Sequence, residues 1–161
     1  MRALEPAVTS SPAALPCAPP THARAQALLR LWEDAAHETG GLPSRRRFAF
    51  ETMRPWVGHV AIWAVERDPM RFRAALIGTQ LVDWDGCDGT GRYLDEIISV
   101  GHRDSAIARC ALVANSGSWY ADAARFVAYG TRTRTLHRLL VPCAEDRITV
   151  DHVITAIFRD D

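Results

Sequence analysis

The chain has 161 residues, of which 48% are hydrophobic, and this is enough for one globular domain with a sizeable core. Its 19 basic residues balance 19 acidic residues, so the protein has no overall field that would attract nucleic acid or an anionic membrane. All of the basic residues are arginines, which excludes mechanisms that need a P-loop lysine or a Schiff-base lysine.

The first 20 residues are rich in proline, alanine and serine, and they predict a disordered leader before a single domain over residues 21–161. Glu5 and several prolines interrupt any apolar run there, which argues against an export signal. No stretch approaches the roughly 20 apolar residues that cross a bilayer. The four cysteines lack zinc-ligand spacing, so we expect a reduced, cytoplasmic protein without a metal site.

A helix is predicted to start at Thr21, which is a good N-cap residue, and to end before Gly40-Gly41. Apolar residues recur in it every three or four positions, which is typical of a helix with one buried face. The candidate contact residues on this face are Leu28, Leu29, Trp32 and Ala36. Core packing and pairing with a second copy both explain such a stripe. The helix over residues 21–38 is therefore our candidate for a homodimer interface.

Two strands are expected at residues 59–66 and 71–77, joined by a tight turn that contains Pro69. In the second strand Phe72, Ala74 and Leu76 recur with a period of two, which predicts that they share one buried face. The short turn makes the two strands an antiparallel hairpin.

A glycine turn at Gly86, Gly89 and Gly91 is expected to open a short helix over residues 92–98. The carboxylates before it alternate as in a calcium loop, but counting from Asp83 puts Leu94 where a bidentate glutamate is needed. We therefore expect turn formation and not metal binding from this segment.

A longer helix is expected over residues 102–114, and three strands over residues 124–129, 133–141 and 148–158. The connections are short, which favours antiparallel neighbours. The predicted fold class is α+β: a five-stranded antiparallel sheet with helices packed on one face and an N-terminal amphipathic helix.

Several short segments resemble one bacterial PAS-domain family in their order and spacing. They are Leu31-Trp32, residues 41–45, residues 71–73 with 76–79, residues 86–92 and residues 138–142. The resemblance covers about residues 25–158. It implies a five-stranded antiparallel sheet that, with its helices, encloses a pocket used to sense small molecules or to pair with other proteins.

PAS domains usually accompany an output module such as a kinase or cyclase, so the resemblance implies that a chain of this length acts through a separate signalling partner. The light-sensing flavin subset carries an Asn-Cys-Arg-Phe run that this sequence lacks. We therefore expect no photochemical flavin adduct.

Strand phase gives a set of candidate pocket residues, although a slip of one residue would invert the face. They are Ile62, Phe72, Leu76, Trp84, Tyr93, Leu139, His152 and Ile154. His152 is in phase with Ile154, which aims it inward. No cofactor is required by the sequence, but one inward histidine would suffice for haem, with His152, His137 and His102 as the options.

Catalytic patterns are missing from the sequence: no serine lies in a G-x-S-x-G elbow, and Cys110 lies on a helix face with no predicted base beside it. We therefore expect a non-catalytic sensory, ligand-binding or protein-interaction domain in bacterial signalling. The alternative is a small α+β enzyme or small-molecule carrier. The polar groups of its cleft would be Asp83, Asp85, His102 and His137.

Overall fold

The fold is built on one antiparallel sheet with the strand order β2-β1-β5-β4-β3. The computed structural model describes residues 18–127 and 133–160, so residues 1–17 of the leader predicted over residues 1–20 lie outside it, as do Ala128 and Tyr129 of a predicted strand. The strands are β1 Val60–Glu66, β2 Arg71–Ile77, β3 Tyr120–Val127, β4 Thr133–Cys143 and β5 His152–Arg159. The five-stranded antiparallel sheet that the sequence predicts is confirmed.

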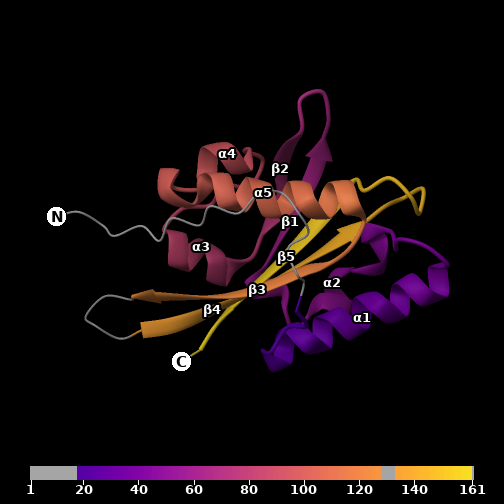
Figure 1. The fold of residues 1–161 in the computed structure, drawn as a ribbon, viewed down its shortest axis with the longest axis horizontal. Helices are drawn as coiled ribbons and strands as arrows, with labels where there is room; N and C mark the ends of the chain where they lie inside the picture. Colours follow the sequence, from indigo (N-terminus) through magenta and orange to yellow (C-terminus); the bar gives the residue numbers. More distant parts are fainter. Residues whose placement is uncertain (1–17, 128–132, 161) are drawn as a thin grey trace.

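Helices cover both faces of this sheet (Figure 1). They are α1 Ala23–Thr39, α2 Phe50–Met53, α3 Thr79–Asp85, α4 Leu94–Ile97 and α5 Val100–Ser116, with short 3₁₀ turns at Arg45–Arg47 and Val57–His59. Figure 1 shows α3, α4 and α5 on one side of the sheet and α1 with α2 on the other. The helices between β2 and β3 thus share one face as expected, and the N-terminal helix covers the opposite face.

The apolar stripe of α1 is the reason for its position, because it packs into a hydrophobic core against the sheet. The helix ends where Gly40 adopts a left-handed conformation with φ 72°, as Gly40-Gly41 predicted. The N-cap prediction was wrong by one residue. His22 and not Thr21 caps the helix, because its Nδ1 accepts a hydrogen bond of 3.3 Å from the backbone N–H of Arg24.

Two hydrophobic cores lie on the two faces of the sheet because successive side chains of each strand point to opposite sides. The α1-side core includes Ala25, Leu28, Trp32, Ile62, Leu139, Val141, Ile154 and Phe158. The α5-side core includes Trp63, Phe72, Leu81, Leu94, Cys110, Val113, Leu140 and Val153. Each core needs its own helical layer to exclude water from it.

A bulge in the β1–β2 hairpin changes the face of Leu76. Ile62 pairs with Leu76 whereas Trp63 pairs with Ala74, so Ala75 is left between two pairs. Phe72 and Ala74 consequently lie in the α5-side core, and Leu76 packs on the α1-side core. The prediction that Phe72, Ala74 and Leu76 share a face was wrong, since the extra residue inverts the alternation.

Other elements also differ from the prediction. Helix α3 was missed, because Leu81 is its single fully buried residue and gives no helical stripe. Strand β3 starts at Tyr120, earlier than predicted. Strand β5 starts later than residue 148, because Asp146 accepts hydrogen bonds from the backbone N–H groups of Ile148 and Thr149 and holds a turn there.

Candidate functional site

The candidate pocket residues are divided between the two faces of the sheet. The α1-side core holds or contacts Ile62, Leu76, Leu139 and Ile154. Phe72 lies in the α5-side core, and Trp84 packs against that core. The structure therefore brings together one group under α1 and a second, smaller group under α5.

Phe72 lines a small hollow with Met70, Leu94 and Ile107, where β2 meets α4 and α5. Its volume of about 20 Å³ is enough for about one water molecule. This hollow is therefore too small for a metabolite.

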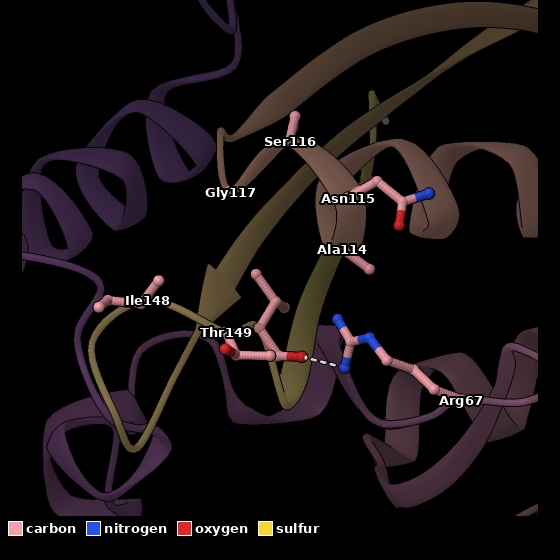
Figure 2. A pocket seen from close by; sticks show the side chains of 8 residues that line it. Arg67, Ala114, Asn115, Ser116, Gly117, Ile148 and Thr149 are labelled. Atoms are coloured by element: carbon pink, nitrogen blue, oxygen red, sulfur yellow. Dashed lines mark hydrogen bonds between the residues drawn. The ribbon is translucent and has the colours of Figure 1, made fainter.

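A larger, open cleft of about 260 Å³ lies beside the end of α5 and the turn before β5. Figure 2 shows Asn115 and Arg67 extending towards the same space from different elements. The Nη1 of Arg67 donates a hydrogen bond of 2.8 Å to the backbone oxygen of Val150, which fixes the guanidinium at one wall. Ile148 forms part of the rim and is 82% exposed. Sequence reasoning missed this cleft, since its walls come from distant segments.

Tyr93 lies outside both cores, at the edge of β2. Its ring centroid is 3.5 Å from the guanidinium carbon of Arg71 and 4.8 Å from that of Arg73. Arg73 also donates a hydrogen bond of 2.6 Å to the Tyr93 hydroxyl, and the backbones of the two residues form an antiparallel bridge. Tyr93 therefore helps to close the free edge of the sheet.

The three histidines that could bind haem lie on three different elements. His152 in β5 is half-buried, with its Nδ1 2.7 Å from an Asp151 carboxylate oxygen. His102 is exposed at the start of α5. His137 in β4 is buried, with its Nε2 3.0 Å from Asp160 Oδ1. Haem ligation by any of them stays a prediction.

A cluster of histidines surrounds the ring of Phe158 in β5. The His22 ring is stacked on Phe158 at 4.8 Å between centroids, and His59 is tilted against the same ring at 5.4 Å. His137 is 5.1 Å from His22. Sequence reasoning considered His137 by itself and missed its contact with His22, because the N-cap position was given to Thr21.

The candidate dimer stripe of α1 is used within the chain. Leu28, Leu29 and Trp32 are at most 7% exposed, and Ala36 packs against the same α1-side core. The indole N–H of Trp32 donates a hydrogen bond of 2.7 Å to the backbone oxygen of Pro142 in β4. Core packing is thus the role that the structure gives to this stripe.

The two buried thiols are poor nucleophiles. Burial raises the pKa of Cys110 to about 12, and burial followed by the charge of Asp151 raises the pKa of Cys143 to about 12. Both thiols therefore stay protonated near neutral pH, and they are unreactive because the thiolate is the reactive form. Cys110 and Cys143 act as small apolar side chains in the two cores.

The polar groups proposed for an enzyme cleft lie on separate elements: Asp83 and Asp85 on α3, His102 on α5 and His137 on β4. His137 faces the start of α1 through its contact with His22. Within residues 18–127 and 133–160, no three histidine, cysteine or acidic side chains are grouped closely enough to hold a metal ion.

No protein-family model matches the chain, and a search of the curated proteins finds no match. Among solved structures, the PAS domain of Bordetella pertussis BvgS is 17% identical, with 70% of this chain and 86% of that chain covered and a TM-score of 0.45. A PAS sensor domain of a Marinobacter aquaeolei diguanylate cyclase is 12% identical, over 62% and 93% of the two chains, with a TM-score of 0.39.

The Rhodobacter sphaeroides LOV protein is 16% identical, with 68% of this chain and 65% of that chain covered and a TM-score of 0.46. The chain is thus similar to these PAS and LOV domains. At these identities the likeness concerns the fold alone, so function has to be argued from the residues of this chain. In the part of the chain that the structure describes, no helix has the length and apolar character needed to span a membrane.

Proposed function

We propose that this chain is a non-catalytic PAS-like sensory domain in bacterial signalling that works by protein interaction and acts through a separate output partner. The observation that carries the proposal is the docking of α1 on the sheet. This helix covers much of one apolar face of the sheet, together with α2, and its stripe and the Trp32 hydrogen bond hold it there. A displacement of α1 would change the surface that a partner meets.

The opposite layer meets the sheet at an ion-pair cluster. Arg138 in β4 donates to both carboxylate oxygens of Asp122 in β3, at 2.6 and 3.1 Å. Arg109 of α5 lies 3.9 Å from the same carboxylate, and all three side chains are mostly covered. Partly buried, bidentate pairs of this kind are costly to break.

Two features support a role in protein interaction over small-molecule sensing and catalysis. The hollow beside Phe72 has room for about one water molecule and not for a metabolite. The thiols of Cys110 and Cys143 are protonated and buried. A cytoplasmic location is part of the proposal and rests on the cysteine pattern of the sequence.

A homodimer through α1 is also part of the proposal. Because the stripe is buried on its own sheet, a second copy would bind it by exchange, with α1 of each chain on the sheet of the other. Gly40 follows α1 and can adopt the conformations that such an exchange needs. Light scattering after size exclusion tests this, and loss of the dimer when residues 1–39 are deleted is the expected result. A dimer that survives the deletion contradicts it.

A carrier of small polar molecules is the second candidate, favoured by the cleft at the end of α5. Arg67, Asn115 and Thr149 supply hydrogen-bonding groups around about 260 Å³ of open space. An anionic or amide-bearing molecule would suit this wall.

Native mass spectrometry with an absorption spectrum of the purified full chain separates the candidates. The interaction proposal expects the mass of the bare chain or of its dimer, and no visible absorption. A retained metabolite that is lost in Arg67→Ala would favour the carrier. A Soret band that is lost in His137→Ala or His152→Ala would replace the proposal with haem sensing.

A further inference from the structure

The first turn of α1 is attached to the sheet by imidazoles. The His22 ring stacks on Phe158 with an interplanar angle of 3° and a centroid distance of 4.8 Å. His137 approaches His22 from β4, and His59 approaches Phe158 from the 3₁₀ turn before β1. Histidines from three separate segments thus lie together. His22 and His59 contact the Phe158 ring, which is 1% exposed, and His137 contacts His22.

His22 also closes the start of the helix. Its Nδ1 accepts a hydrogen bond of 3.3 Å from the backbone N–H of Arg24, which otherwise has no partner within the helix. A ring nitrogen can accept this bond only while it carries no proton, since both nitrogens of the imidazolium are donors. The cap therefore requires neutral His22.

The charged groups around His22 oppose a second positive charge there. Arg24 lies on the same turn, with its guanidinium carbon 4.9 Å from the Phe158 ring centroid and a hydrogen bond to the backbone oxygen of Pro55. The N-terminal end of α1 adds its own partial positive charge. His137 faces His22 from β4, and Asp160, beside His137, is the carboxylate that partly offsets these charges.

The surroundings of His59 also favour its neutral form. Its ring lies between Phe158, at 5.4 Å, and Trp84 of α3, at 5.6 Å. The guanidinium carbon of Arg159 lies 4.0 Å from the centroid of the Trp84 ring. Its Nδ1 is buried and has no hydrogen-bond partner among the described residues. A proton on this nitrogen would be a buried donor without an acceptor, which is costly.

We propose that the imidazoles of His22 and His59 form an acid-operated latch: protonation releases the first turn of α1 from Phe158 and loosens the helix from the sheet. The inference concerns the fold and goes beyond the proposed signalling role, so it holds or fails whether or not a partner reads α1. The stimulus is a fall in pH below the ordinary pKa of histidine.

The direction of the pH dependence follows from linkage. Burial, and then the charge of His137, lowers the pKa of His22 below its usual value of 6.5. Burial, and then the charges of Arg24 and His22, lowers the pKa of His59 in the same way. The released state therefore binds protons more strongly than the docked state. The docking free energy is fully present above about pH 6.5 and is lost as the pH falls below it.

Amide hydrogen exchange of the full chain tests the latch. Protection factors for residues 24–29, corrected for the intrinsic rates, should fall between about pH 7.5 and about pH 5.5, by at most about tenfold for each histidine that gains a proton on release. Amides in β4 and β5 should keep most of their protection. A parallel loss in the strands would mean general unfolding and would overturn the latch.

Two variants of α1 form a matched pair. His22→Asn keeps a capping acceptor that does not titrate, so the part of the acid-induced loss that belongs to His22 should disappear and the part that belongs to His59 should remain. His37→Asn makes the same change at an exposed histidine in the last turn of α1, and it should leave the loss intact. An unchanged loss in His22→Asn would overturn the proposal. If that variant does not fold, an NMR titration of His22 in the natural sequence is the test. A titration midpoint of His22 at or above pH 6.5 would overturn the proposal.

Discussion

The indole N–H of Trp32 donates a hydrogen bond of 2.7 Å to the backbone oxygen of Pro142, and this bond joins α1 to β4 across 110 positions of the chain. Trp32 is 7% exposed and lies in the α1-side core. It thus adds a directional contact to the apolar packing of the helix, and it fixes where along the sheet α1 lies.

Trp32→Phe should lower the free energy of unfolding by about 1–3 kcal/mol, because it leaves the Pro142 carbonyl buried without a donor. Trp32→Ala should lower it by about 3–5 kcal/mol, since it also creates a cavity. Urea unfolding followed by circular dichroism measures both. Equal stability of Trp32→Phe and the natural sequence would mean that the hydrogen bond contributes nothing.

The Asp122 carboxylate should contribute more to the free energy of unfolding than an exposed carboxylate does. Asp122→Asn should cost about 3 kcal/mol, because Arg138 and Arg109 lose their shared, mostly covered partner. The control is Glu66→Gln, which breaks the exposed pair with Arg73 and should leave the urea midpoint almost unchanged. If both changes have similar effects, the burial of the Asp122 pair is not what makes it strong.

Replacing two glycines by alanine should change the stability of the fold in opposite directions. In Gly78→Ala the new Cβ would lie 2.4 Å from the backbone oxygen of Gly58, a contact that forces the chain apart and destabilises the fold. In Gly101→Ala the Cβ meets nothing within 4 Å, and the change within α5 should stabilise by about 0.5–1 kcal/mol. Thermal unfolding of the two variants should show shifts of opposite sign.

Thiol labelling should distinguish the described cysteines. In a Cys17→Ser background, Cys87 is exposed and should react with a disulfide reagent at once, whereas Cys110 and Cys143 should react only after unfolding. Cys87→Ser should abolish the fast phase. Rapid reaction of all three thiols in the folded protein would contradict the burial that raises the pKa of Cys110 and Cys143 to about 12.

Stability should fall on mild acidification. His22 and His59 have lowered pKa values in the fold, so the unfolded chain gains their protons first as the pH drops through about 6.5. The carboxyls of Asp95 and Asp146 also have lowered pKa values, from hydrogen bonds to Arg71 and to the backbone at Ile148, but their contribution is lost only at lower pH.

The urea midpoint at about pH 5.5 should accordingly lie below that at about pH 7.5. His59→Gln, which removes one of the titrating rings, should make the difference between these two urea midpoints smaller. A midpoint that rises on acidification would contradict the lowered pKa values of His22 and His59.

Local signals in the sequence determined the strands and helices that carry strong periodicity. The stripe around Leu28 and Trp32 predicted α1, and the alternation from Arg71 to Ile77 gave the bounds of β2, because both depend only on neighbours along the chain. Helix α3 escaped prediction, since a segment with one fully buried residue has no pattern to detect.

Only the tertiary structure decided which residues meet. The unpaired Ala75 moved Leu76 to the α1 side, a change that depends on the partner strand and not on the sequence of β2 alone. Likewise, His22, His59 and His137 come from three distant segments and meet at Phe158 because the sheet and α1 are packed there. Periodicity reports the environment of a residue, whereas contacts between distant segments are fixed by packing.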